Sequence, residues 1–348
     1  MAPIAAYDTY LALHFPSLST FLSSTSHLSV ISSTSKTSSS LLISIKSPPD
    51  SPSPWSDTSQ LPSAASGSSS SSSSALPSPP PPIPSPSSLW LPLEGSLASI
   101  YSAATREFLR SNRILAKVDV VLDQMRTIST CSPPGCTNSI SWTYSPDEDQ
   151  SDSEGERIGN NSNAVGGGGQ GSYEVVATGG TFDHLHAGHK ILLTMACSIT
   201  SRKLIVGVSD EPLLGNKKFK QFLQTINERI SSVERFIELV RPGIQHQVVP
   251  LQDVYGPTAT DPDIQALVVS EETRLGGDAI NKLRSEKSLS TLETYVINLV
   301  SDDGSTTNTI SKGDDEEERE KENQVKVAVE TKMGSTGIRE WMSKQESS

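Results

Sequence analysis

The sequence has little of the apolar material that a fully folded chain of its length requires. Of its 348 residues, 34% are hydrophobic and 5% are aromatic, and both fractions are low for a globular protein. We therefore expect one folded core with long disordered stretches around it. No run of about 18 apolar residues occurs, so we expect no membrane span. The first arginine is Arg106, which argues against a transit peptide.

Basic residues and cysteines are also scarce. The chain has 28 Lys and Arg against 40 Asp and Glu, a net charge of −12, whereas a nucleic-acid partner would require a basic face. Its three cysteines, Cys131, Cys136 and Cys197, fit a reducing compartment. No second Cys pair or His pair accompanies Cys131 and Cys136, so we expect no metal site in the protein. A cytoplasmic location is expected, with the nucleus as the alternative.

Runs of Ser, Pro, Gly and acidic residues divide the chain into parts. Such segments cannot bury enough surface to fold on their own. Residues 1–48 and 90–128 contain apolar patches and helical spacing, but no chemical motif. Neither the role of these residues nor the oligomeric state of the protein is predicted. The expected parts are 1–48 and 90–128 as two halves of a small accessory α/β unit, 49–89 as a Ser/Pro-rich linker, 129–171 as an acidic and Gly-rich linker, 172–344 as the main domain, and 302–323 as a disordered acidic insertion within it.

The main domain alternates between strand-like and helix-like segments. Short apolar runs predict the strands, and apolar residues at helical spacing predict the helices. This alternation predicts a Rossmann-like, doubly wound parallel α/β sheet, with ligands bound at the carboxyl ends of the strands. The expected strands are 175–177, 203–208, 248–250, 266–270, part of 292–300, and 325–329, and the expected helices are 188–199, 225–240 and 276–286, with the fold ending in 334–344.

Residues 178–190, T-G-G-T-F-D-H-L-H-A-G-H-K, lie between an expected strand and an expected helix. Gly179 and Gly180 would let backbone N–H groups approach phosphate oxygens. The start of the helix adds further N–H groups and the positive end of the helix dipole. His186 and His189 can lean toward the same anion and stabilise charge on a transferring phosphoryl group. This segment therefore predicts nucleotidyl transfer.

The G-T-F-D turn followed by H-x-G-H resembles the nucleotidyltransferase superfamily, which includes phosphopantetheine adenylyltransferases and cytidylyltransferases. Residues 253–262, D-V-Y-G-P-T-A-T-D-P, and 269–284, V-S-E-E-T-R-L-G-G-D-A-I-N-K-L-R, resemble the eukaryotic type of phosphopantetheine adenylyltransferase. The resemblance covers most of 173–344. It implies that the adenylyl group of ATP is transferred to 4′-phosphopantetheine, giving dephospho-coenzyme A and pyrophosphate, the penultimate step of coenzyme A synthesis. Mg²⁺ would accompany ATP.

The same resemblance assigns roles to individual residues. Thr181, His186 and His189 would contact the phosphates, and one lysine of the group at 217, 218 and 220 would steady the transferring phosphate. Residues 332–339, K-M-G-S-T-G-I-R, resemble a segment that grips the β- and γ-phosphates, with Gly334 in place of an expected serine. The expected catalytic residues are His186, His189, Lys217, Lys218 and Arg274, and the expected nucleotide-binding residues are Gly179, Gly180, Thr181, Phe182, Asp183, Gly188, Ser335, Thr336 and Arg339.

Two other functions and several structural roles remain open at this point. Cytidylyltransferases of phospholipid synthesis share H-x-G-H but resemble R-T-E-G-I-S-T in the last motif, where this chain has K-M-G-S-T-G-I-R. A nucleotide-binding scaffold that assembles other coenzyme A enzymes through the N-terminal region is a non-enzyme alternative, and the intact histidines argue against it. Asp183 could equally fix the turn, and Ser335 or Thr336 could cap the last helix.

Overall fold

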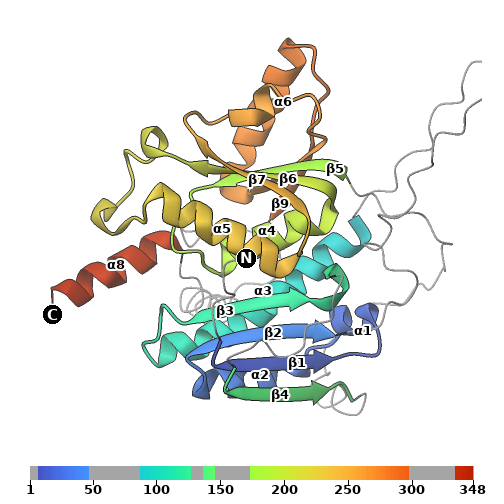
Figure 1. Ribbon diagram of the computed structural model, residues 1–348, viewed down its shortest axis with the longest axis vertical. Coiled ribbons are helices and arrows are strands. Elements are labelled where there is room, and N and C mark those ends of the chain that lie inside the picture. Colours follow the sequence, from blue (N-terminus) through green and yellow to red (C-terminus); the bar gives the residue numbers. More distant parts are fainter. Residues whose placement is uncertain (1–6, 47–86, 127–135, 146–172, 298–333, 348) are drawn as a thin grey trace, which may run out of the picture.

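The computed structural model describes residues 7–46, 87–126, 136–145, 173–297 and 334–347, which form two parallel β-sheets with their helices (Figure 1). One sheet has the strand order β3-β2-β1-β4 and the other has the order β7-β6-β5-β8-β9. The expected insertion at 302–323 and the expected strand at 325–329 lie outside the described residues.

The first sheet belongs to an N-terminal unit built from 7–46, 87–126 and 136–145, and all its strand pairs are parallel. The interval 129–171, expected to be a linker, in fact contains its edge strand, β4. Only Ile140 and Trp142 of that strand pack against the core, so the short polar segment gives a weak sequence signal. The elements are β1 (Thr9–His14), α1 (Leu18–Ser23), α2 (His27–Thr37), β2 (Ser40–Lys46), α3 (Ser87–Arg110), β3 (Lys117–Leu122), η1 (Asp123–Met125) and β4 (Asn138–Thr143).

The second sheet is the predicted Rossmann-like, doubly wound α/β fold, and this prediction is confirmed. All of its neighbouring strands are parallel. Its strands are β5 (Tyr173–Gly180), β6 (Thr200–Ser209), β7 (Gln245–Leu251), β8 (Ala266–Ser270) and β9 (Glu293–Ile297). Its helices are α4 (Ala187–Ile199), α5 (Ile226–Val240), α6 (Arg274–Glu286) and α8 (Ser335–Glu346), with the short turns η3 (Glu211–Leu213), η4 (Lys220–Phe222), η5 (Gly256–Ala259) and η6 (Glu271–Thr273).

Helices cover both faces of this sheet, because successive side chains of a strand point to opposite faces. Val175 and Ala177 pack with Ile280 of α6 on one face. Val176 faces the other way, into a core that includes Leu193 of α4. Figure 1 shows α6 on one side of the sheet and α4 and α5 on the other.

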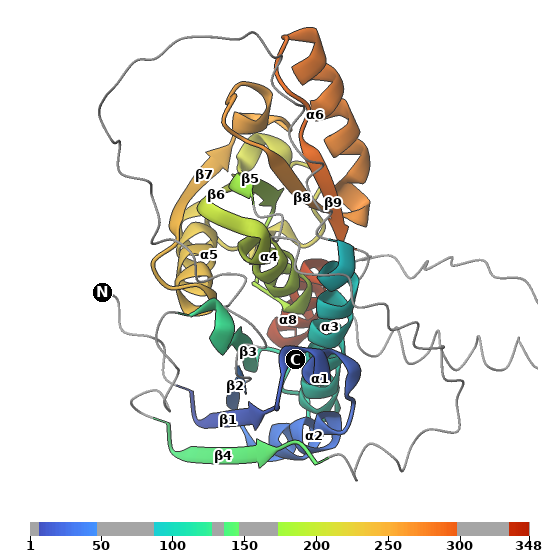
Figure 2. The same cartoon turned by 90° about the vertical axis from the view of Figure 1, so that its right-hand side faces the viewer.

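The N-terminal unit packs against the α4 and α5 side of the second sheet. Helix α3 contacts α4, and strand β3 contacts α5. Both views show this arrangement, with β3 as the strand of the N-terminal sheet nearest to the second sheet (Figures 1 and 2). One hydrophobic cluster includes Leu97 of α3, Leu193 of α4 and Val233 of α5, so the two units share a continuous core.

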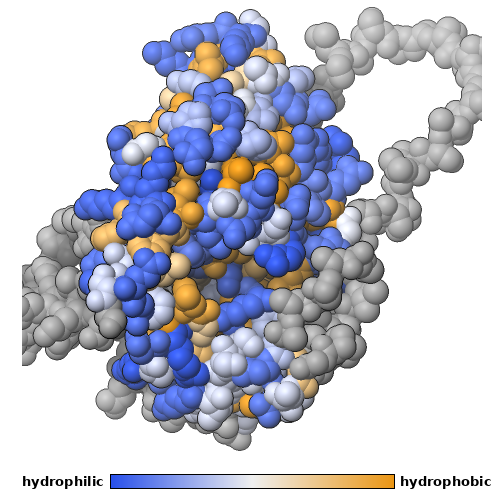
Figure 3. All heavy atoms as spheres, turned by 60° about the vertical axis from the view of Figure 1, so that its left-hand side comes forward, coloured by the Kyte–Doolittle hydropathy of each residue, from blue (hydrophilic) through white to orange (hydrophobic). Residues whose placement is uncertain are grey.

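The described surface is mainly hydrophilic on the face shown in Figure 3, with smaller groups of apolar side chains between the polar ones. Among the described residues, none of the helices combines the length and the apolar content that a bilayer crossing requires.

The strand order places β5 at the centre of the second sheet. The chain runs from β5 outward through β6 and β7, and then crosses to β8 and β9 on the other side. In open α/β sheets, the crevice for a ligand lies at the carboxyl ends of the two strands where this reversal occurs. The fold therefore predicts a ligand site at the ends of β5 and β8, at Gly180 and Ser270.

Candidate active site

The turn between β5 and α4 has an unusual backbone. Phe182 and His184 have positive φ angles, 51° and 44°, which non-glycine residues rarely adopt. Such conformations persist only where the surrounding structure enforces them, and they are frequent at functional sites. A Cβ atom at Gly180 would lie 3.4 Å from the buried Phe182 ring, in ordinary van der Waals contact, so the ring packs closely beneath the turn.

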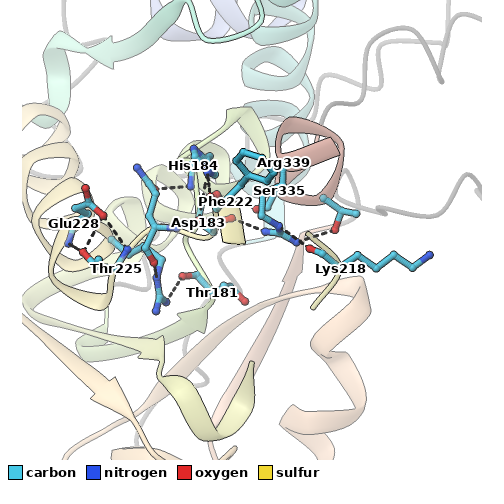
Figure 4. Close-up of polar contacts among 12 residues, drawn as sticks. Thr181, Asp183, His184, Lys218, Phe222, Thr225, Glu228, Ser335 and Arg339 are labelled. Carbon is cyan, nitrogen blue, oxygen red and sulfur yellow. Dashed lines mark hydrogen bonds and ion pairs between the residues drawn. The ribbon is translucent and has the colours of Figure 1, made fainter. Parts of the chain in front are cut away.

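Asp183 connects this turn to two other segments of the chain (Figure 4). Its carboxylate is completely buried and forms an ion pair with Arg339 of α8. The other carboxylate oxygen accepts a 2.9 Å hydrogen bond from the Gln224 backbone N–H. Its carbonyl oxygen accepts a 2.9 Å bond from the Ser335 hydroxyl. Asp183 therefore holds together the β5–α4 turn, the segment before α5, and the start of α8.

The remaining donors of Arg339 are also used within the protein. Its Nε donates to the Lys218 carbonyl at 3.0 Å, and its Nη2 donates to the Thr336 hydroxyl at 3.2 Å. Residues 215–225, called the lysine loop here, are thus fixed from the side of α8. Arg229 of α5 is also buried, and its Nη1 donates to the Thr181 carbonyl at 2.9 Å.

His184 fixes the lysine loop from the side of the turn. Its backbone N–H donates to the Gln224 side chain at 2.7 Å, and its Nε2 lies 2.8 Å from the Phe222 carbonyl oxygen. The second contact requires that the ring carry its proton on Nε2, because a carbonyl oxygen can only accept. His184 is not among the site residues that the sequence predicts.

Three of the expected nucleotide-binding residues have buried side chains. Phe182, Asp183 and Arg339 have 0%, 0% and 1% exposure, and the polar groups of Asp183 and Arg339 are paired with each other and with backbone groups. These side chains therefore pack within the protein, beneath the turn. The Ser335 hydroxyl is likewise committed, since it donates to the Asp183 carbonyl. Of the two roles considered for Asp183, the structure supports fixing the turn.

The two histidines of the motif stack on each other at the start of α4. The ring centroids of His186 and His189 are 3.9 Å apart, and the Phe182 ring lies 5.2 Å from His189. Burial lowers the pKa of His186 to about 3, and the charges of Lys190 and His184 act in the same direction. Burial, His186 and Lys217 also lower the pKa of His189. Both rings are therefore neutral at pH 7, and each has one N–H to donate.

One ring nitrogen of this pair has no partner in the described part of the chain. The Nδ1 atom of His189 is buried and forms no hydrogen bond there. Buried polar atoms without a partner are uncommon, and an unsatisfied one is typical of a catalytic group or of a position that binds water or a ligand. This observation singles out His189 within the motif.

The three expected lysines have different surroundings, although all are exposed. Lys220 forms an ion pair with Glu211 at 3.1 Å. The charge of Lys218 helps to lower the pKa of Glu340 on α8, after that residue's stronger contact with Lys344. Lys217 is the one whose charge contributes to the lowered pKa of His189. Lys217 is therefore the lysine best placed to act together with the histidines.

Two helices begin at this site without a side-chain cap. The N-cap residues are His186 for α4 and Gly334 for α8, and neither forms a capping hydrogen bond. By contrast, Thr225 and Glu228 cap α5 through a complete capping box. The first turns of α4 and α8 thus keep N–H groups that an anion can bind. The glycine at 334 removes a hydroxyl but leaves these N–H groups uncovered.

The second strand end at which a ligand is expected is that of β8, at Ser270. Arg274 is the first residue of α6, is exposed, and forms a 3.5 Å ion pair with Glu271. Arg284 at the other end of α6 is fully buried, and its Nη1 donates to the carbonyls of Thr258 at 2.7 Å and Asp261 at 2.9 Å. Arg284 thus joins the two stretches that carry the family resemblance, a role that the sequence analysis missed.

The other expected nucleotide-binding residues are partly exposed. Gly179, Thr181 and Gly188 are partly exposed along the end of β5, the turn and the first turn of α4. Thr336 is partly exposed at the start of α8. Within the described ranges, no group of three or more His, Cys, Asp or Glu side chains could hold a metal ion.

The fold and the motif at the end of β5 define a Rossmann-like nucleotidyltransferase domain. A family model described as cytidylyltransferase-like matches residues 177–333. A phosphopantetheine adenylyltransferase of Methanopyrus kandleri is 35% identical over 130 residues, which are 37% of this chain and 82% of that protein. The chain therefore belongs to the phosphopantetheine adenylyltransferase family.

Two fungal relatives are similar over part of their length. A phosphopantetheine adenylyltransferase of Saccharomyces cerevisiae is 46% identical over 128 residues, 37% of this chain and 42% of that protein. An uncharacterized protein of Schizosaccharomyces pombe is 39% identical over 155 residues, 44% and 45% of the two chains. The match thus spans less than half the length of either fungal relative.

A solved structure from Archaeoglobus fulgidus, a protein with unknown function, aligns with 28% identity and a TM-score of 0.32 over 35% of this chain and 88% of that one.

Replacing Arg339 by Met should destabilise the protein strongly. The substitution leaves the buried Asp183 carboxylate without its cation, and breaking a buried pair in this way typically costs about 3–5 kcal/mol of unfolding free energy. Arg274→Met is the matched control, because Arg274 is exposed and its ion pair should contribute less than about 1 kcal/mol. Denaturant unfolding of both variants measures the difference. Wild-type stability of the Arg339 variant would show that the ion pair does not hold the site together.

Proposed function

We propose that this protein transfers the adenylyl group of ATP to 4′-phosphopantetheine, giving dephospho-coenzyme A and pyrophosphate. The observation that carries the proposal is the convergence of three segments at the carboxyl end of β5. The β5–α4 turn, the lysine loop and the start of α8 are joined there through Asp183 and Arg339. Together they supply neutral histidines, a lysine and uncapped helix N–H groups, which are the donors that a triphosphate requires.

The proposed chemistry is one in-line displacement. A phosphate oxygen of 4′-phosphopantetheine attacks the α-phosphorus of ATP, and the bond from that phosphorus to the oxygen bridging to the β-phosphate breaks. Pyrophosphate leaves with the electron pair of that bond. The attacking group is already an anion, so the protein needs no covalent intermediate. Catalysis then consists of positioning the two phosphates and stabilising the charge between them.

Individual roles follow from the positions of the side chains. His189 and the N–H groups of the first turn of α4 would bind the oxygens of the α-phosphate, with Thr181 and His186 beside them. Lys217 would neutralise charge on the transferring group as a compact cation. The N–H groups at the start of α8 and the Thr336 hydroxyl would bind the β- and γ-phosphates. Arg274, at the end of β8, would reach a nucleotide phosphate.

ATP would enter as its Mg²⁺ complex, with the metal bound by the triphosphate. The donor set agrees with this, because the one carboxylate of the motif, Asp183, is fully buried and held by Arg339 and the Gln224 N–H. The side chains that face the proposed phosphate positions are imidazoles and ammonium groups. The bound metal would supply further neutralisation of the triphosphate charge.

The comparisons favour this function over the two alternatives. The relatives named phosphopantetheine adenylyltransferase support adenylyl over cytidylyl transfer. The orphaned Nδ1 atom of His189 supports an active enzyme over a scaffold for coenzyme A enzymes. We further propose a cytoplasmic location, with the nucleus as the alternative, since Cys136 and Cys197 are both free thiols.

A pyrophosphate-release assay on the full chain tests the proposed function. We expect release with ATP and 4′-phosphopantetheine together, and none above background when the acceptor is omitted. CTP with phosphocholine or phosphoethanolamine should give no release. Turnover with CTP and a phospho-alcohol would assign the protein to phospholipid synthesis instead. Nucleotide binding without any turnover would support the scaffold alternative.

His189→Ala should reduce kcat by about 100- to 1,000-fold, because the variant loses a donor aimed at the developing charge. The fold should survive, since the ring makes no hydrogen bond through Nδ1 within the described residues. His246→Ala is the control, because His246 lies near the amino end of the edge strand β7, on the side of the sheet away from the crevice. Circular dichroism and kcat are measured for both. Near-normal turnover of a folded His189→Ala protein would contradict the assigned role.

A further inference from the structure

A buried group of charges lies where the N-terminal unit meets α4. Lys190 directly follows His189, and its side chain points away from the crevice into the N-terminal unit. Its ammonium group donates to the Asp119 carboxylate at 2.9 Å and to the Val118 carbonyl at 2.6 Å. Asp119 and Val118 both belong to β3, and the exposed fractions of Asp119 and Lys190 are only 2% and 8%.

Other groups of the N-terminal unit hold Asp119 in place. The Tyr7 hydroxyl donates to its second carboxylate oxygen, and the Lys117 ammonium lies 3.6 Å from the same oxygen. Burial opposes ionisation, but Lys190 and Lys117 together hold the pKa of Asp119 below its usual value. Asp119 is therefore a buried anion whose strongest cationic partner lies on the helix that carries the two motif histidines.

In the described part of the N-terminal unit, aromatic side chains occupy the position equivalent to the end of β5 and β8. Its strand order, β3-β2-β1-β4, repeats the order of β7, β6, β5 and β8 in the second sheet. The ends of β1 and β4, however, are filled by aromatic side chains. The ring of Phe15 lies 5.2 Å from Phe21, 5.4 Å from His27, 5.6 Å from Trp142 and 6.0 Å from Tyr144. The described part of this unit meets the second sheet through α3, which contacts α4, and β3, which holds Lys190.

We propose that Asp119 is a positioning residue for catalysis: by holding Lys190, it fixes the first turn of α4 and thereby the rings of His186 and His189. This inference rests on the proposed function above. The N-terminal unit is then a required part of the active enzyme, although Asp119 touches neither substrate. The three residues 186, 189 and 190 lie within about one turn of one helix, so a shift of Lys190 moves both rings.

The charge of Lys190 also acts on the two histidine rings. Lys190 already contributes to the lowered pKa of both His186 and His189. Asp119 offsets that charge, so its removal would leave a cation close to the rings without the one anion that pairs with it among the described residues. The ammonium group would then move toward solvent or toward the phosphate positions, and the helix start would move with it.

Asp119→Asn tests the proposal, because it removes the charge and keeps the shape of the side chain. Asp123→Asn is the matched control: Asp123 forms an ion pair with Lys46 at 3.0 Å in the same unit, and both partners lie in the N-terminal unit. In the full chain, well below the melting temperature, Asp119→Asn should lower kcat by about 10- to 100-fold, as misplacement by about 1 Å can do. The KM for ATP should change much less, and Asp123→Asn should retain wild-type kcat.

Histidine NMR signals provide a measurement that does not depend on turnover. The chain has six histidines, so the ring signals of His186 and His189 can be assigned by single substitutions. Asp119→Asn should shift these two signals and leave His246 unchanged, whereas Asp123→Asn should shift neither. Equal effects of the two variants on kcat, or unshifted His186 and His189 signals in Asp119→Asn, would overturn the proposal.

If Asp119→Asn does not fold, Tyr7→Phe decides the question, because it removes only the hydroxyl that bonds the Asp119 carboxylate. The same signals should shift by a smaller amount, with about a 2- to 5-fold loss of kcat, and unshifted signals would again refute the inference. Failure of the proposed function is separable from this result. A wild-type chain without turnover would refute the adenylyltransferase assignment, while the histidine signals would still test the contact between Asp119 and α4.

Discussion

The candidate site depends on one buried ion pair, between Asp183 and Arg339. Burying two charges is costly, and the cost is recovered only when nearly every donor and acceptor of the pair is satisfied. Here the remaining groups are satisfied by the Gln224 N–H, the Lys218 carbonyl and the Thr336 hydroxyl. Each partner belongs to a different segment than Asp183 itself. The β5–α4 turn, the lysine loop and α8 therefore stabilise one another.

This arrangement divides the charged residues into two groups with different tasks. Arg229, Arg284 and Arg339 are almost completely buried, and each donates to backbone carbonyls that fix a loop. Lys217, in the lysine loop, and Arg274, at the start of α6 after β8, remain exposed. Because the buried arginines hold the loops rigid, the exposed cations can be presented at defined positions, which is what electrostatic catalysis requires. The pair of Asp119 and Lys190 extends the same principle to the N-terminal unit.

The sequence predicts the fold and the location of the candidate site. It does not predict which charged residues of the site are buried and which are exposed. The strands and helices of the second sheet follow from local apolar periodicity, and the motif at 178–190 is contiguous, so both can be recognised without tertiary information. Asp183 and Arg339 are 156 positions apart along the chain, and no local pattern distinguishes a buried arginine from one that binds phosphate. Strand β4 was missed for a related reason, since only two of its side chains reach the core.

The most direct test of this account is a crystal structure of the full chain with ATP and Mg²⁺. The account predicts a triphosphate between the first turns of α4 and α8, with His189 and Lys217 at the α-phosphate and Arg339 still bound to Asp183. A triphosphate bound away from the end of β5 would contradict it. So would an Arg339 side chain that has left Asp183 to bind phosphate, because the ion pair would then be a partner of the substrate rather than the element that holds the site together.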